Sequence, residues 1–198
     1  MATDTRAIRQ FAEGKIAKLS VPAAIASASL WEVKPFRSNS AVSKMLGLML
    51  AFNKPLDLLN GQRVDVGKSL SWSNDKEYHH FFPQAYLARR RIGASKANVV
   101  GNIVLLTSKS NIDIRDSAPS EYLNEIIERE GRDNLVRRME SNLVPKDALD
   151  AALADDYGAF LKIRAQHVHQ VAQAMAGISY GPPLRPEDIE DADDDPTE

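Results

Sequence analysis

The stretch Glu77-Tyr78-His79-His80-Phe81-Phe82-Pro83 interrupts a chain whose other patterns are mostly helical. Two of the four histidines are adjacent in this stretch, and aromatic residues flank them on both sides. We predict a strand that runs into a loop here, because aromatic residues favour strands and proline ends them. Twenty-two residues after His80 the run Asn102–Thr107 begins, and its apolar composition predicts a second, buried strand. Asn111 follows nine residues after the start of that run.

Apolar residues recur at helical spacing in most of the remaining chain. The predicted helices cover residues 5–29, 40–53, 84–91, 119–130, 133–142 and 155–176, with a further helix beginning at Pro145. Ser40 is a residue type that caps helix starts, and Pro119 suits a first helical turn. The fold class is therefore α+β, a mostly helical domain around one central two-stranded element. We expect any chemistry to lie where the helical pattern breaks.

Composition excludes several classes of protein. The chain has 198 residues, of which 43% are apolar and 26% charged, as is typical of globular proteins. The absence of cysteine excludes a disulfide scaffold, an iron–sulfur protein, a thiolate zinc site and a cysteine nucleophile. The longest apolar runs are too short to span a bilayer, and residues 1–15 contain no apolar signal region. We therefore expect a cytoplasmic protein with no membrane partner.

Charge is distributed unevenly along the chain. Residues 187–198 contain eight acidic and no basic side chains, so residues 1–186 hold 25 basic and 19 acidic residues, a formal charge of +6. A segment this acidic and this poor in apolar residues is predicted to be disordered. It either solubilises the chain or imitates a nucleic acid and competes for a basic face. The mildly basic remainder is compatible with a polyanionic partner.

Together these elements resemble the HNH nucleases, whose core is a ββα-metal finger in which two strands and a helix hold one divalent ion. The residues that carry the resemblance are His79-His80-x-x-Pro83, Asn102-Ile-Val-Leu-Leu-Thr107, Asn111 and Pro119-Ser120-Glu121-Tyr122-Leu123. The chain is most similar to the HNH domain that ends GmrSD-type modification-dependent restriction proteins. The C-terminal helices of that group are also similar to Leu143-Val144-Pro145 and Phe160-Leu161-x-x-Arg164.

The resemblance implies an organisation and an activity. The implied segments are an N-terminal helical region over 1–74, the finger over 75–123, C-terminal helices over 124–180 and an acidic tail over 181–198. The implied activity is metal-dependent hydrolysis of DNA phosphodiester bonds, in bacterial defence against foreign DNA. Two alternatives stay open. One is a non-catalytic nucleic-acid-binding or regulatory module that keeps the finger as a scaffold, and the other is a nuclease fragment that needs a separate sensor or NTPase domain.

The resemblance also implies a role for each polar residue of the finger. His80 matches the general base, a task that neutral imidazole can perform because its ordinary pKa is about 6.5. Asn102 matches the central asparagine, whose amide bridges the loop between the strands and holds the base in place. His79 and Asn111 match the first and last metal ligands. Two neutral ligands completed by a substrate phosphate favour Mg²⁺, with Mn²⁺ as a substitute.

The same residues have structural interpretations as well. An isolated histidine pair is more often part of a satisfied core, and Asn111 also suits the N-cap of a helix. Arg89-Arg90-Arg91 and Lys96 fall between the two predicted strands, either as a clamp on DNA phosphates or as a solvated helical face. Arg115 comes four residues after Asn111, one turn further on if a helix starts there. It either meets a phosphate or is an ordinary surface arginine.

Two further patterns are interpreted as structural. His167 and His169 are two residues apart on a predicted helix, which sends them to different sides and makes them a poor metal pair. Residues 60–63, Asn-Gly-Gln-Arg, are faintly similar to the Asp-Gly-Gln-Gln-Arg motif of the nucleotide-hydrolysing domain that accompanies these HNH domains in full-length relatives. The acidic residue is missing here, so we interpret the segment as a turn.

Overall fold

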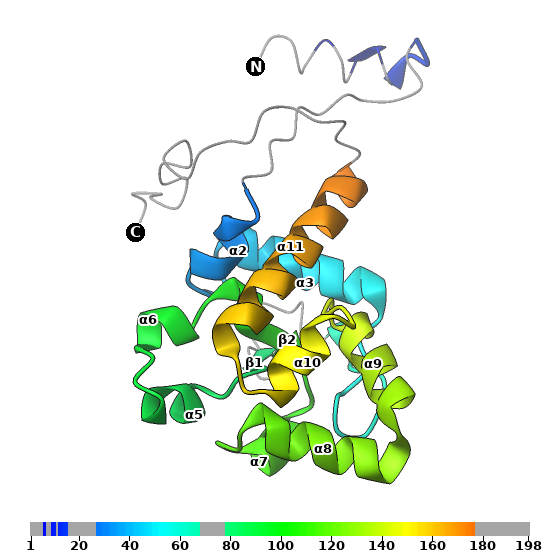
Figure 1. Cartoon of the computed structure of the whole chain (residues 1–198). Coiled ribbons are helices and arrows are strands. Elements are labelled where there is room, and N and C mark those ends of the chain that lie inside the picture. The colour runs from blue at the N-terminus through cyan, green and yellow to red at the C-terminus, as the bar shows by residue number, and fades with distance from the viewer. Residues whose placement is uncertain (1–5, 7–8, 11, 16–26, 68–77, 177–198) are drawn as a thin grey trace.

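The computed structural model describes residues 6, 9–10, 12–15, 27–67 and 78–176. Its centre is a two-stranded antiparallel sheet of β1 (Tyr78–His80) and β2 (Ile103–Leu105), surrounded by helices (Figure 1). His79 lies opposite Val104 in the register, with His80 opposite Ile103. The predicted α+β class and the predicted strand pairing are therefore confirmed. β2 is shorter than predicted at both ends, because Asn102 belongs to a 3-10 turn, η2 (Val100–Asn102), and Thr107 already caps the next helix.

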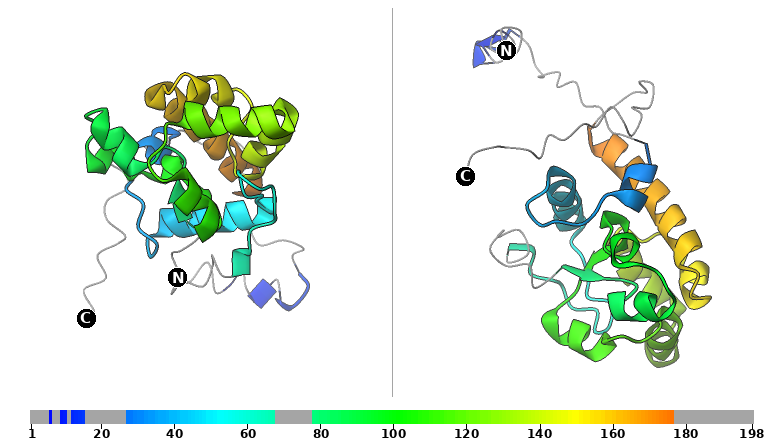
Figure 2. Two further views of the ribbon diagram at one scale, coloured as in Figure 1. Left: turned by 90° about the horizontal axis from the view of Figure 1, so that it is seen from below. Right: turned by 90° about the vertical axis from the view of Figure 1, so that its left-hand side faces the viewer.

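Helices make up most of the described chain. Before the sheet come α2 (Ser29–Val33) and α3 (Ala41–Asn53), and between the strands come α5 (Gln84–Arg89) and α6 (Ala94–Ala97). After β2 the chain forms α7 (Ser108–Ile114), α8 (Pro119–Glu130), α9 (Arg132–Ser141), α10 (Ala148–Leu153) and α11 (Tyr157–Ala176). In the right-hand view of Figure 2, α11 runs along one side of the molecule and the strands lie further inside. No described helix is long and apolar enough to cross a membrane.

Local signals place several helix ends where the sequence predicts them. The Ser40 hydroxyl accepts a hydrogen bond from the backbone N–H of Ser43 at 3.2 Å and so caps α3. Pro119 opens α8, and Gly131, with φ +86°, follows its last residue. Residues 60–63 form the predicted turn, in which Gly61 has φ +68° and the N–H of Asp57 donates to the oxygen of Gln62.

Two local predictions are wrong. Pro145 lies in a turn, and the helix predicted to open there begins later, at Ala148. Asn111 is not an N-cap, because Thr107 caps α7 by accepting the N–H of Ser110. The predicted helix over 5–29 and the acidic tail lie mostly or wholly outside the described residues.

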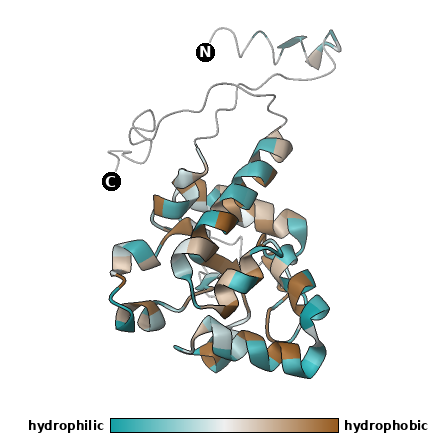
Figure 3. Cartoon of the chain, in the orientation of Figure 1, coloured by the Kyte–Doolittle hydropathy of each residue, from teal (hydrophilic) through white to brown (hydrophobic). Residues whose placement is uncertain are grey.

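The sheet separates two hydrophobic clusters. Val104 of β2 belongs to the cluster that contains Phe81 and Phe160, whereas its neighbours Ile103 and Leu105 belong to the cluster that contains Trp31. Alternate side chains of a strand point to opposite faces, so this short strand is buried on both sides. Figure 3 shows the apolar ribbon at the centre of the molecule, around the strands. Both clusters combine residues from before and after the segment 78–123, so packing connects this segment to its flanking helices.

Candidate active site

Two buried phenylalanines fix the position of the histidine pair. Phe81 and Phe82 are fully buried directly after β1. The ring of Phe81 stacks on Phe160 of α11 with 4.5 Å between ring centres, and its backbone oxygen accepts a hydrogen bond from the Tyr122 hydroxyl at 2.8 Å. The loop after β1 is therefore anchored by α8 and α11. His79 and His80, which precede the two phenylalanines, are half-buried.

Asn102 bridges the loop between the two strands. Its side chain is fully buried, its Oδ1 accepts the N–H of Phe82 at 2.9 Å, and its Nδ2 donates to the oxygens of Phe82 and Ala97, each at 3.0 Å. The N–H of Phe81 donates to the backbone oxygen of Asn102 at 2.8 Å. One amide thus fixes both ends of the loop 81–102. The resemblance implies this arrangement for the central asparagine of the finger.

Close packing surrounds the turn that carries Asn102. A Cβ at Gly101 would lie 2.6 Å from the backbone oxygen of Trp31, so only glycine fits there. Arg164 of α11 is fully buried and donates to the backbone oxygens of Gly101 at 2.8 Å and Ile103 at 2.6 Å. It also donates to the oxygens of Asn142 and Leu143. Arg164 therefore ties α11 to the residues on either side of Asn102, a structural role that the sequence alone does not reveal.

His80 contacts two carboxamide side chains through one ring nitrogen. Its Nε2 lies 3.0 Å from Oδ1 of Asn98 and 2.9 Å from Nε2 of Gln84. Burial lowers the pKa of His80 from its ordinary value, and the hydrogen bond with Asn98 opposes this shift. The imidazole is therefore neutral at neutral pH. A neutral imidazole held in a fixed position, here at the last residue of β1, is the state that a general base requires.

The two metal ligands that the resemblance implies come from different elements, His79 from β1 and Asn111 from α7. His79 follows the pleat of β1, so its side chain points to the face opposite that of His80. Asn111 is half-buried in the middle of α7, which begins at Ser108, soon after β2 ends at Leu105. Strand, strand and helix thus follow in the order that a ββα finger requires.

As the two ligands that the resemblance implies, His79 and Asn111 would offer a metal ion few donor atoms. No group of three or more His, Asp or Glu side chains suited to a metal is present within residues 27–67 and 78–176. One imidazole nitrogen and one amide oxygen leave most coordination positions to water and phosphate oxygens. Mg²⁺ commonly binds in this way at sites where a substrate phosphate completes its shell. The donor set therefore fits a weakly held ion and does not fit a permanently bound structural metal.

A buried carboxylate, which the sequence analysis missed, fixes the start of α7. Asp57 is fully buried, and its Oδ2 accepts the N–H and the hydroxyl of Thr107, both at 2.8 Å. Its Oδ1 accepts the Ser110 hydroxyl at 2.7 Å and the N–H groups of Leu59 and Asn60. Asp57 thereby holds the first turn of the helix that carries Asn111. The Asn60-Gly61 turn beside it is the sequence signal that pointed to this corner.

The arginine cluster lies on the surface at the end of α5. Arg89, Arg90, Arg91 and Lys96 are all exposed, as both interpretations of the cluster require. The guanidinium groups of Arg89 and Arg90 each lie 5.9 Å from the ring centre of Tyr86. Arg89 also forms an ion pair with Asp116, which lies just after α7, and donates to its backbone oxygen at 2.6 Å. Hydrogen bonding from Arg89 lowers the pKa of Asp116.

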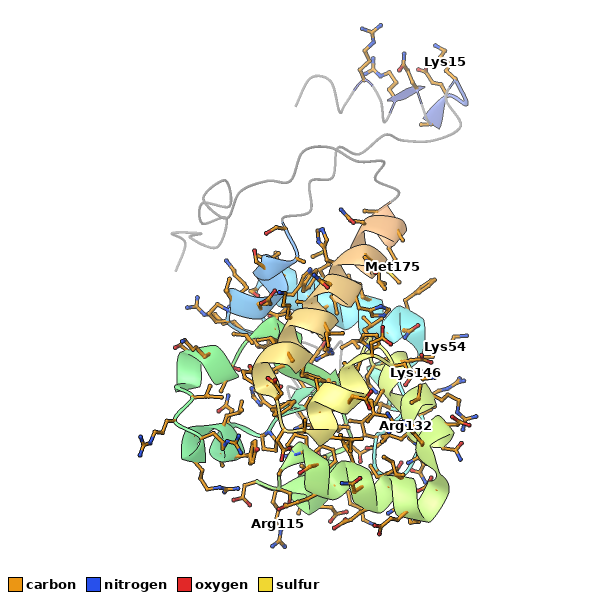
Figure 4. The ribbon with its side chains drawn as sticks, in the orientation of Figure 1. Lys15, Lys54, Arg115, Arg132, Lys146 and Met175 are labelled. Carbon is orange, nitrogen blue, oxygen red and sulfur yellow. The ribbon has the colours of Figure 1, made fainter. Side chains whose placement is uncertain are left out.

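Arg115 lies one turn beyond Asn111, at the C-terminal end of the helix that carries it. α7 ends at Ile114, and the N–H of Arg115 donates to the backbone oxygen of Asn111 at 3.0 Å. Arg115 has φ +52°, so the chain turns away from the helical path at this residue. Its exposed side chain points away from the body of the molecule (Figure 4).

His167 and His169 are half-buried on α11. Burial is the main cause that lowers the pKa of each.

Comparison of the chain with protein-family models, with curated proteins and with solved structures finds no match. Function is therefore inferred from the residues of the finger and their geometry.

Proposed function

We propose that this protein is an HNH-type endonuclease that hydrolyses DNA phosphodiester bonds with the help of a divalent metal ion. The observation that carries the proposal is the bridge made by the Asn102 amide across the loop that follows His80. It supports the proposal because a general base must be held at a fixed place beside the scissile phosphate. The bridge lies next to an antiparallel strand pair, and the helix that carries Asn111 follows the second strand.

The chemistry assigned to the chain is proton transfer and positioning. Hydrolysis requires a water molecule to attack phosphorus in line with the leaving 3′ oxygen. His80 takes the proton of that water, and its lowered pKa keeps it ready to do so at neutral pH. Asn102 holds in place the loop that follows His80. His79 and Asn111 would hold the ion, which when bound supplies charge stabilisation for the leaving oxygen.

DNA is the proposed partner. Arg89, Arg90, Arg91 and Lys96 supply exposed positive charge on the segment between the strands, where contacts to phosphates would give affinity without sequence preference. The proposal extends to a cytoplasmic role in bacterial defence, which rests on the resemblance to GmrSD-type restriction proteins. A separate sensor or NTPase domain is a proposed partner on the same ground.

The test is incubation of the protein with supercoiled plasmid DNA and Mg²⁺ or Mn²⁺, with and without a chelator. Conversion to open-circular or linear DNA that the chelator abolishes is the expected result. DNA that is bound but left intact with either ion would contradict the enzyme proposal and favour the scaffold alternative. Cleavage that persists in excess chelator would contradict the proposed metal dependence.

A further inference from the structure

We propose that Asn98 is a positioning residue that keeps the imidazole proton of His80 on Nε2, so that Nδ1 is the nitrogen that accepts the proton of the attacking water. This inference rests on the proposed function, because it assigns the atom of His80 that does the work. Neither Asn98 nor the tautomer of His80 is part of the resemblance, since no residue between Pro83 and Asn102 belongs to its motifs.

The orientation of the Asn98 side chain is determined by Phe36. Nδ2 of Asn98 lies 3.1 Å from the backbone oxygen of Phe36. A carbonyl oxygen can only accept, so the NH₂ end of the amide faces Phe36 and Oδ1 faces His80. The backbone supports this orientation, because the N–H of Phe36 donates to the oxygen of Asn98 at 3.0 Å. A bridge between Pro35 and Val99 continues the pairing.

The tautomer of His80 follows from that orientation. Oδ1 of Asn98 carries no hydrogen and lies 3.0 Å from Nε2 of His80, so the hydrogen of this bond belongs to Nε2. A neutral imidazole carries only one N–H, and its other nitrogen holds the lone pair that accepts a proton. With Nε2 protonated, that lone pair is on Nδ1.

Gln84 contacts the same nitrogen but cannot set the tautomer. Its Nε2 is 2.9 Å from Nε2 of His80, and a protonated nitrogen cannot accept a hydrogen bond from it. A half-turn of the exposed Gln84 amide brings its oxygen to this position and lets it accept as well. The described residues show no second hydrogen bond that opposes the half-turn, whereas Phe36 opposes it for Asn98. Gln84 therefore adapts to the tautomer that Asn98 imposes.

The segment that precedes the finger is consequently part of the base's environment. Phe36 lies 62 residues before Asn98 in the chain, and its ring lies 5.2 Å from that of Tyr78 at the start of β1. The N-terminal segment thus contacts both the strand of the histidine pair and the amide that orients His80.

The tautomer can be measured by NMR without any cleavage assay. In ¹⁵N-labelled protein at about pH 8, where imidazole is neutral, long-range ¹H–¹⁵N correlations distinguish a protonated from an unprotonated ring nitrogen. The expected result is a single Nε2–H form for His80 in the parent and in Gln84→Ala, and a mixture of both tautomers in Asn98→Leu. A parent spectrum with the proton on Nδ1, or an unchanged single form in Asn98→Leu, would overturn the proposal.

Cleavage measurements separate this inference from the proposed function. If the protein cuts DNA, Asn98→Leu is expected to lower the rate by roughly 10-fold to 100-fold, the usual effect of removing a side chain that orients a functional histidine. Asn134→Ala, a change at an exposed residue of α9, should cut at nearly the parent rate. Parent-like cleavage by Asn98→Leu would overturn the positioning role and leave the nuclease proposal intact. If the parent cuts nothing, the spectra still decide whether Asn98 sets the tautomer.

A second variant covers the case in which Asn98→Leu does not fold. Asn98→Asp keeps an acceptor toward Nε2 of His80 and is expected to retain the Nε2 proton. A proton found on Nδ1 in this variant would overturn the proposal.

Discussion

Asn102 shows how one side chain can hold a loop in place. Its amide pairs with the N–H and oxygen of Phe82 and with the oxygen of Ala97, and Asn102 and its two partners are all buried. The interior offers these backbone groups no water as a replacement, so loss of the amide leaves them unsatisfied. The position of His80 and the stability of the fold therefore depend on the same residue.

Removing that amide should destabilise the protein. We expect Asn102→Ala to lower the free energy of unfolding by about 2–4 kcal/mol, because several buried backbone groups lose their partner. Urea denaturation measures this change. Asn134→Ala is the matched control, since Asn134 is exposed on α9 and its replacement should change stability by less than about 0.5 kcal/mol. Equal stability of Asn102→Ala and the parent would contradict the bridge.

At the scale of elements, Asp57 determines where α7 begins. Its carboxylate accepts hydrogen bonds from Thr107, from Ser110 and from the turn that follows Asp57 itself. A buried carboxylate with this many donors stabilises one placement of the helix, and with it the placement of Asn111. Replacement of an acceptor oxygen by an NH₂ group would bring two donors together at this point.

We therefore expect Asp57→Asn to lower the free energy of unfolding by roughly 2–4 kcal/mol. Hydrogen exchange of the Thr107 and Ser110 amides should also become faster, because the first turn of α7 loses its anchor. Asp113→Asn, an exposed change on the same helix, should leave both measurements close to those of the parent. Unchanged exchange at Thr107 in the Asp57 variant would show that the helix start is held by something else.

The arginine cluster belongs to the same scale, because it begins at the end of α5 and Arg89 contacts Asp116, just after α7. If it binds DNA phosphates, replacing Arg89, Arg90 and Arg91 together by Ala should weaken affinity equally for all sequences. The slope of log affinity against log salt should fall by about one unit for each phosphate that the variant no longer neutralises. Arg89→Ala alone should have the smallest effect of the three single changes, because Asp116 already pairs with Arg89.

Fluorescence anisotropy with labelled duplexes at several salt concentrations measures these slopes. Arg137→Ala removes an exposed arginine from α9 and serves as the control. If the triple variant had the same slope of log affinity against log salt as the parent, the cluster would be a solvated surface and not a phosphate clamp.

At the scale of the whole molecule, two half-buried histidines of α11 link stability to pH. Burial lowers the pKa of His167 and of His169 in the folded state, whereas in the unfolded chain each titrates near its ordinary value of about 6.5. Below that value the unfolded chain binds more protons than the folded one. Stability is therefore fully present above about pH 6.5 and falls as the pH drops toward the folded pKa values.

Chemical denaturation between about pH 8 and pH 5 should record this loss, and replacing both histidines by Gln should reduce it. The Nδ1 atom of His169 is buried without a hydrogen-bond partner among the described residues, so its protonation gains no compensating bond. A double variant with the same pH dependence as the parent would assign the loss to other groups.

Local patterns account for the parts of the fold that the sequence predicts. The strand pair follows from two aromatic or apolar runs, and α3 and α8 follow from Ser40, Pro119 and Gly131 at their ends. The error at α7 has a physical reason, since Thr107 and Asn111 can both cap a helix. α7 begins directly after Thr107, earlier than a cap at Asn111 would place it. Asp57, 50 residues away, accepts hydrogen bonds from Thr107 at this helix start.

Long-range hydrogen bonds account for what the sequence does not predict. Asn98 donates a hydrogen bond to Phe36, which is 62 residues away in the sequence, and Arg164 donates one to Ile103, 61 residues away. The spacing of these residues does not predict such hydrogen bonds, because the bonds form only when the helices pack together. The polar motif of the finger is visible in the sequence, whereas the residues that support it are not.

Substitution of His80 tests the central claim most directly. In a plasmid assay with Mg²⁺, His80→Ala should cut roughly 100-fold to 10,000-fold more slowly than the parent, the usual contribution of a general base. Its affinity for DNA should be retained, because phosphate contacts supply that affinity. His169→Ala, a change on α11, should cut like the parent. If His80→Ala also cut DNA at the parent rate, His80 would not be the base and the proposed active site would be wrong.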